Sequence, residues 1–105
     1  MAVSSSEQYR RADIIIDAVC KVGNIDYLQF ITEPRSVKLS TLRGIACILS
    51  WEYDIHPRKI AKLIQRSRAN VINQTNRYRS WLNNGDKLTI EYYNKVKEEL
   101  TKKIQ

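Results

Sequence analysis

The fold is decided by one stretch of the chain, residues 56–85, which reads HPRKIAKLIQRSRANVINQTNRYRSWLNNG. Pro57 stands where a proline that opens a helix belongs, and apolar residues follow it at helical spacing. A tight basic connection comes next at residues 65–67, and Ser67 can cap a second, longer helix. Short helix, tight turn and longer helix together predict a helix-turn-helix over about residues 57–82.

The second helix of this pair presents two different faces. One face is expected to contact the core through Val71, Thr75, Tyr78 and Leu82. The opposite face and its flanks carry small, amide and guanidinium side chains, which suit the base edges in a major groove of DNA. Because docked helices of this class contact bases mainly near their N-termini, the predicted base readers are Arg68, Ala69, Asn70 and Asn73.

The charge of the chain is concentrated in the same stretch. Residues 56–85 hold seven Lys and Arg side chains and no Asp or Glu, whereas the remaining 11 basic residues are balanced by the 11 acidic ones. This stretch therefore carries the whole net charge of +7, and a polyanion is the expected partner. The predicted phosphate contacts are Arg58, Lys59, Lys62, Arg66, Ser67, Arg77 and Arg79.

The rest of the chain also follows helical periodicity, so the predicted fold is all-α. We expect one domain over residues 1–105, a small helical domain of five to six helices with the helix-turn-helix at its centre. The other helices are expected at about residues 6–22, 25–30, 41–53 and 87–104.

Local signals predict where these helices begin and end. The expected caps are Ser4, Asn24, Ser40 and Asp86, and Gly23 is expected to end the first helix. Three apolar residues of the short second helix are expected to pack on the first: Ile25, Leu28 and Phe30. Trp51 and Tyr53 are expected to cover the end of the helix at residues 41–53.

Residues 34–40 have no strong period and carry two cations, which predicts a loop. Arg35 and Lys38 could reach an adjacent minor groove or the DNA backbone, as flexible basic arms do. The alternative is a loop whose charges are simply solvated.

The C-terminal helix, expected at about residues 87–104, has two possible roles. It can complete the core with the first helix, or it can form the seam of a homodimer. A dimer would bring two half-sites together and raise both affinity and selectivity.

Several function classes are not expected. Cys20 and Cys47 lie in apolar surroundings without metal-ligand spacing, so both are predicted to be small core residues, and no metal or other cofactor is expected. His56 has no catalytic partner in the sequence and is predicted to be a helix cap, so we expect no enzyme. The N-terminus lacks a signal peptide and no apolar run could span a membrane, which predicts a cytoplasmic protein.

A family resemblance runs from about Asp13 to Leu82. It is carried by Ile16 and Val19, by residues 24–28, 35–36 and 43–49, by Leu39, by Pro57-x-x-Ile60-Ala61-x-x-Ile64 and by Val71. In this order the features resemble the C-terminal DNA-binding domain (domain IV) of the bacterial replication initiator DnaA, whose helix-turn-helix is similar to that of the Trp repressor.

The resemblance implies a helix-turn-helix fold that binds double-stranded DNA, and a minor-groove contact for Arg35. The family opens its second helix with Asp-His-Thr-Thr-Val, where this chain has Ser-Arg-Ala-Asn-Val at residues 67–71, so the target sequence is expected to differ. No GxxxxGK[ST] phosphate loop occurs around the three glycines, so neither a nucleotide cofactor nor ATPase activity is implied.

The sequence therefore predicts sequence-selective binding of double-stranded DNA by a transcriptional or replication-related regulator. Two alternatives stay open: an adaptor whose basic surface meets an acidic protein, and a helical module that binds structured RNA.

Overall fold

The computed structural model describes residues 3–32 and 36–102, and all regular structure in these residues is α-helical, as the sequence predicts. The helices are α1 (Ser5–Gly23), α2 (Tyr27–Thr32), α3 (Val37–Glu52), α4 (Pro57–Ile64), α5 (Arg68–Asn83) and α6 (Lys87–Thr101). None of the helices in this part of the chain is long and apolar enough to cross a membrane.

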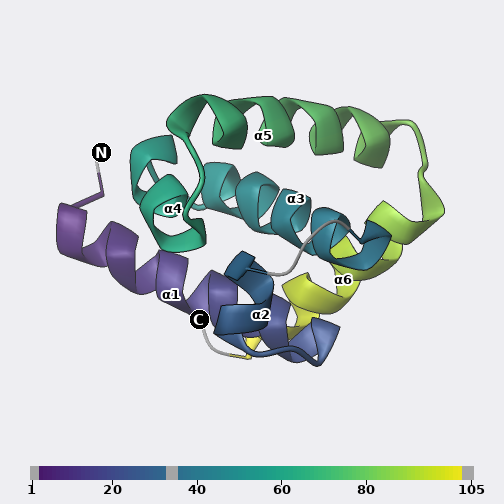
Figure 1. The fold of residues 1–105 in the computed structure, drawn as a ribbon, viewed down its shortest axis with the longest axis horizontal. Helices are drawn as coiled ribbons and strands as arrows, with labels where there is room; N and C mark the ends of the chain where they lie inside the picture. Colours follow the sequence, from purple (N-terminus) through teal and green to yellow (C-terminus); the bar gives the residue numbers. More distant parts are fainter. Residues whose placement is uncertain (1–2, 33–35, 103–105) are drawn as a thin grey trace.

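Helix α3 forms the centre of the molecule. It contacts α1, α4, α5 and α6, and Leu42, Ile45 and Leu49 are completely buried along it. Figure 1 shows α5 running above α3, with α1 and α6 on the other side and α4 between α1 and the beginning of α5. This layering leaves the outer side of α5 uncovered.

Several predicted helix caps are confirmed. Ser4, Ser67 and Asp86 each accept a hydrogen bond from the backbone N–H three residues further on, at 3.2, 3.0 and 3.0 Å. The Nδ1 atom of His56 accepts from the Arg58 N–H at 3.1 Å, which confirms His56 as the cap of α4. Each cap occupies a backbone N–H that has no partner within the helix.

The junction between α1 and α2 differs from the prediction. Gly23 is the last residue of α1, and the left-handed residue after it is Asn24, with φ of 55°. A Cβ atom on Gly23 would lie 2.5 Å from Cδ1 of Leu42, so this glycine serves the close approach of α1 to α3. Asn24 therefore ends α1 and does not cap α2.

The cap of α2 is Asp26. Its Oδ1 accepts from the Gln29 N–H at 2.8 Å, and the Gln29 Oε1 accepts from the Asp26 N–H at 3.0 Å. This reciprocal pair is a capping box, and it starts the helix two residues later than expected. In consequence Phe30 is buried, Ile25 is half-buried against the core, and Leu28 is 64% exposed, so the predicted packing of Leu28 on α1 is wrong.

The predicted cap at Ser40 is also wrong. Ser36 caps α3 by accepting from the Leu39 N–H at 3.0 Å, and the buried Leu39 adds an apolar turn to the beginning of this helix. Lys38 therefore lies in the first turn of α3 and not in a loop. Arg35, the other cation predicted to reach DNA from this region, lies outside the described residues.

Helix α6 packs on α1 and α3, with Val96 and Leu100 completely buried. Lys21 of α1 and Glu99 of α6 form a salt bridge of 3.2 Å across the same contact. Of the two roles expected for this helix, completion of the core is the one seen; Ile104, from the predicted apolar stripe, lies outside the described residues.

Both cysteines are buried and free, as predicted for core residues. Burial raises the pKa of the Cys20 thiol to about 11 and that of Cys47 to about 12. Both thiols are therefore protonated at neutral pH and are poor nucleophiles.

Candidate functional site

Helices α4 and α5 form a compact pair joined by three residues. Helix α4 ends at Gln65, whose left-handed backbone (φ 56°) turns the chain sharply, and Ser67 then caps α5. Of the predicted buried stripe of α4, Ile60, Ala61 and Ile64 are buried and Leu63 is half-buried against the core. Apolar contacts with the core therefore hold the pair in place.

A glycine sets how closely α5 lies on α3. A Cβ atom on Gly44 would lie 2.2 Å from the ring of Tyr78, so any side chain there would push the two helices apart. Val71, Thr75 and Tyr78 are buried in this contact, which confirms most of the predicted stripe; Leu82, at its end, is half-buried. Because the inner face of α5 is fixed in this way, its opposite face points to solvent.

The predicted base readers do not all share that outer face. Arg68, Ala69 and Asn73 are exposed. Asn70 is half-buried and lines a hollow of about 90 Å³ together with Arg43 and other residues of α3 and α5. The structure therefore brings three of the four predicted readers together on the open surface and turns Asn70 toward α3.

Six of the seven predicted phosphate contacts fall into two groups. Arg58, Lys62 and Arg77 are exposed and form no salt bridge or cation–π contact with a described residue, and Ser67 is exposed at the cap of α5. The other group lies against neighbouring side chains: the Lys59 Nζ is 5.4 Å from the ring centroid of Tyr9, and the Arg79 Cζ is 3.8 Å from that of Trp51.

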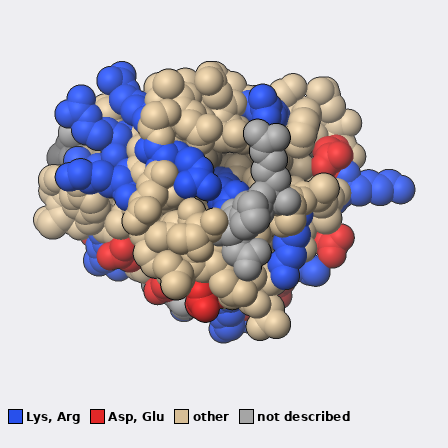
Figure 2. All heavy atoms as spheres, in the orientation of Figure 1, with Lys and Arg blue, Asp and Glu red and all other residues tan. Residues whose placement is uncertain are grey.

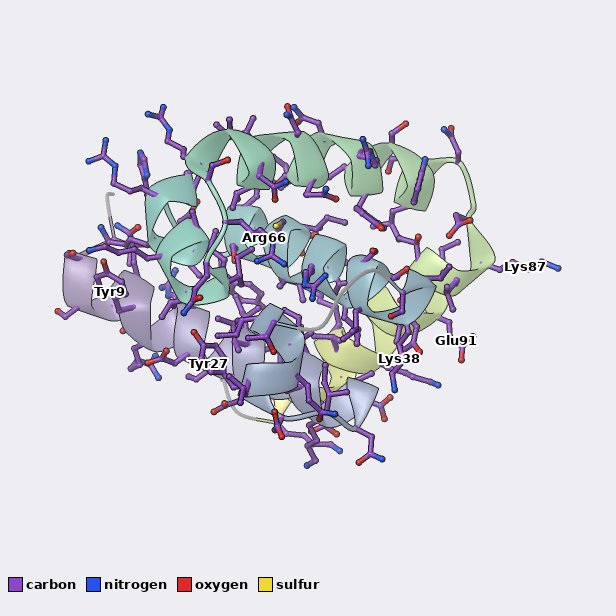
Figure 3. The ribbon with its side chains drawn as sticks, viewed as in Figure 1. Tyr9, Tyr27, Lys38, Arg66, Lys87 and Glu91 are labelled. Carbon is purple, nitrogen blue, oxygen red and sulfur yellow. The ribbon has the colours of Figure 1, made fainter. Side chains whose placement is uncertain are left out.

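Arg66 faces the body of the protein. Its Nη1 donates to the carbonyl oxygens of Ile31, Ile64 and Gln65 at 3.4, 3.3 and 3.1 Å. Figure 3 shows this side chain below α5 and above α2. Arg66 thus ties the turn before α5 to the end of α2, a positioning role that the sequence does not indicate.

The cations of residues 56–85 lack acidic partners in the part of the chain that the structure describes. Among the described residues, none of these seven side chains forms a salt bridge, whereas all ion pairs seen involve α1, α6 or the end of α3. In Figure 2, Lys and Arg gather where α4 and the beginning of α5 lie, and the visible Asp and Glu follow the lower edge and the opposite end. Basic side chains therefore predominate on this part of the described surface.

Lys38 belongs to a different part of the surface. Figure 3 shows it at the end of α3 farther from α4. The first turn of α3 adjoins the second half of α5, since Val37, Arg77 and Trp81 line one shallow groove. Lys38 is exposed there, away from Arg68 and Asn73.

Two apolar residues near the readers are exposed although the sequence does not predict it. Ile72 is 37% exposed next to Asn73, and Trp51 is 54% exposed, so Trp51 does not cover the end of α3 as expected. The signal for Ile72 is its place one residue beyond the buried Val71, which puts it on the flank of the apolar stripe. Nothing in the sequence pairs Trp51 with Arg79.

Comparisons with models of protein families, with curated proteins and with solved structures gave no match to this chain. The resemblance to the initiator domain therefore rests on the residues quoted above. Within residues 3–32 and 36–102, no group of three or more His, Cys, Asp or Glu could hold a metal ion.

Proposed function

We propose that this chain binds double-stranded DNA sequence-selectively through α4 and α5, as a transcriptional or replication-related regulator without ATPase activity. The observation that carries the proposal is the set of exposed cations on these two helices, which no acidic group in the described residues neutralises. A surface of this kind attracts the phosphate backbone and supplies most of the affinity for DNA.

Helix α5 has the properties of a groove-reading helix. Its first turn is exposed, and a helix fits the major groove of B-DNA, which is about 12 Å wide. Arg68 can donate two hydrogen bonds to guanine, Asn73 can pair bidentately with adenine, and Ala69 can contact a thymine methyl group. Asn70 is a weaker candidate, because it is half-buried beside α3.

The exposed cations lie on both sides of these readers. Arg58 and Lys62 project from α4, and Arg77 lies further along α5. Phosphate contacts from two helices would fix the orientation of α5 in the groove. Arg66 acts indirectly in this arrangement, by holding the turn that aims the beginning of α5.

The resemblance to domain IV of DnaA supports the same mode of binding. It extends to the two helices of the motif and to Val71, which is buried here. The residues at 67–70 depart from the family, so the proposed target differs from that of the initiator. The nucleotide-dependent activities of the initiator are not part of the proposal.

Selection of bound sequences from a random duplex pool tests this proposal. We expect enrichment of a short motif, with loss of preference at single positions for Arg68→Ala and Asn73→Ala and a loss of about 1 to 3 kcal/mol in binding free energy for the preferred site. Asn94→Ala and Lys102→Ala, both exposed on or next to α6, are matched controls that should leave the motif unchanged.

Two outcomes would contradict the proposal. Enrichment that both reader variants leave intact would overturn the assigned readout. Failure to bind any duplex at low salt would overturn DNA binding itself and would direct attention to an acidic protein or a structured RNA as the partner.

A further inference from the structure

A groove runs along one flank of α5, where this helix meets α3. It consists of two hollows of about 90 and 510 Å³, and Ser40 lines both. Asn70 lines the first hollow and Trp81 the second, and these two residues lie about 16 Å apart along α5 at 1.5 Å per residue. Arg68 and Asn73, two of the proposed readers of a duplex, are not part of this lining. We call this feature the α3–α5 groove.

The lining of the α3–α5 groove is basic. Among the described residues it contains Arg43, Arg66 and Arg77 and no Asp or Glu. Arg66 is oriented by carbonyl oxygens, which do not neutralise its charge, and neither Arg66 nor Arg77 forms a salt bridge with a described residue. In Figure 2, basic side chains extend below α5 toward the middle of the view. A groove of this charge attracts a polyanion.

Trp81 places an aromatic ring at one end of the groove. The side chain is 43% exposed, and it contacts the ring of Tyr78 edge to face, with 4.8 Å between the centroids. No described Lys or Arg stacks on Trp81, whereas the guanidinium of Arg79 covers one face of Trp51, the other exposed tryptophan. A partly exposed ring beside cations is the arrangement on which proteins stack the bases of single strands.

Two amide side chains line the other end of the groove. Asn70 and Gln74 are half-buried there, one helical turn apart. An amide group both donates and accepts hydrogen bonds, so it suits the edge of an unpaired base. Bases inside a duplex are stacked on their neighbours, so only a base that has left the stack can place its ring against Trp81. The half-buried position of Asn70, which makes it a weak reader of a major groove, fits this different role.

We propose that the α3–α5 groove binds single-stranded DNA. One base stacks on the ring of Trp81, and other bases lie beside Asn70 and Gln74. Phosphates of the strand contact Arg66 and Arg77. An acidic peptide would match the charge of the groove but has no row of flat bases for the ring and the amides. Binding of a single strand does not depend on the proposed duplex function, and only the choice of DNA over RNA rests on it.

The fluorescence of Trp81 tests the site directly. The chain has two tryptophans, so Trp51→Leu leaves Trp81 as the only indole, and Trp51 does not line the groove. We expect dodecathymidylate to quench this fluorescence saturably at moderate ionic strength, because a base stacks on the ring. The reverse variant, Trp81→Leu, keeps Trp51 and should show no such quenching.

Anisotropy of a labelled dodecathymidylate measures the affinity. Trp81→Leu should weaken binding about fivefold or more through the loss of one base–aromatic stack, and Trp81→Phe, which keeps a flat ring, should recover most of the affinity. An abasic strand with the same number of phosphates should bind the parent about fivefold more weakly or worse for the same reason.

A charge variant tests the middle of the groove. Ser40→Glu places an acid where the two hollows meet and should weaken binding of dodecathymidylate about fivefold or more. Asn94→Glu makes the same change of charge on the exposed side of α6 and should weaken it less than about twofold. Circular dichroism checks that each variant is folded.

Duplex binding, measured in parallel, separates the two proposed surfaces. Trp81→Leu should leave the selected duplex motif unchanged, and Arg68→Ala should leave the affinity for dodecathymidylate unchanged. A parent chain that binds the single strand but no duplex would contradict the proposed function and leave the groove site in place.

Several outcomes would overturn the groove site itself. These are an absence of saturable quenching, equal binding of the abasic strand, and a Trp81→Leu variant that binds dodecathymidylate like the parent. Tighter binding of polyglutamate than of dodecathymidylate would overturn it in favour of an acidic protein. Tighter binding of dodecauridylate would overturn the assignment to DNA.

Discussion

The two halves of this molecule use charge differently. In the half formed by α1, α6 and the end of α3, six salt bridges join basic side chains to acidic ones, three of them through Glu7 or Lys21. In the half formed by α4 and α5, seven cations have no such partner in the described residues. Exposed salt bridges contribute little to stability, so the difference concerns the surface that each half offers to a partner.

The largest expected effect tests how α5 is held in place. Gly44→Ala should lower the free energy of unfolding by about 3 kcal/mol or more, because the new Cβ would lie 2.2 Å from the ring of the buried Tyr78. Urea denaturation followed by circular dichroism measures the change.

Gly85→Ala is the matched control. Apart from its chain neighbours, no described residue has an atom within 4 Å of a Cβ at this position, but its φ of +85° strains any other residue, so the expected loss is about 1 kcal/mol. Equal losses at the two glycines would show that close packing at Gly44 does not determine the position of α5.

The next prediction compares the loss of three positive charges from one half with the same loss from the other half. Replacement of Arg58, Lys62 and Arg77 by Gln should lower the affinity for a duplex about tenfold or more at moderate ionic strength, because each cation is expected to neutralise one phosphate. Replacement of Lys21, Lys95 and Lys102 by Gln removes the same charge from the salt-bridged half and should change the affinity less than twofold. Similar losses in both triple variants would mean that net charge alone attracts DNA. Fluorescence anisotropy with a labelled duplex makes the comparison.

The same two halves show what the sequence could predict. In α4 and α5, proline at the first position, a serine cap and an apolar stripe agree with one another, and the structure follows them closely. Between α1 and α3 the local signals compete: Ser36 and Ser40 stand one helical turn apart, and only the burial of Leu39 favours the earlier cap. Tertiary packing decides which of the two serines caps α3, and a local sequence pattern carries no information about that packing.

The candidate site shows a similar limit. Helical periodicity places Arg68, Ala69 and Asn73 on the outer face of α5. It does not reveal that Arg66 turns back to three carbonyl oxygens, or that Arg79 lies over Trp51. Long side chains such as Arg can reach in several directions, so their orientation depends on partners distant in the sequence.

Loss of the cap of α5 should have a smaller effect on stability. Ser67→Ala removes the hydroxyl that accepts from the Asn70 N–H at 3.0 Å and should lower the free energy of unfolding by about 1 kcal/mol. Ser67→Asp keeps an acceptor at this position and should restore the stability. Thermal unfolding distinguishes the variants. A Ser67→Ala protein as stable as the parent would contradict the role of this cap.

The smallest expected effect lies in the salt-bridged half and depends on pH. Lys21 hydrogen-bonds to Glu99 and, with Lys102 nearby, lowers the pKa of Glu99 below its usual value of 4.5. The folded state therefore binds this proton less readily than the unfolded state does, so the contribution of Glu99 to stability is present above about pH 4.5 and is lost as the pH falls through the lower pKa. Glu99→Gln should flatten the fall in stability below pH 4.5, measured by urea denaturation across pH; an unaltered profile would exclude this contribution.

The salt dependence of duplex binding tests the central claim most directly. The logarithm of the association constant should fall linearly with the logarithm of the salt concentration, with a slope of about −0.9 for each phosphate that the cations on α4 and α5 neutralise. With at least three exposed cations on these helices, we predict a slope of about −3 or steeper. A slope near zero, or no binding to any duplex at low salt, would contradict the account.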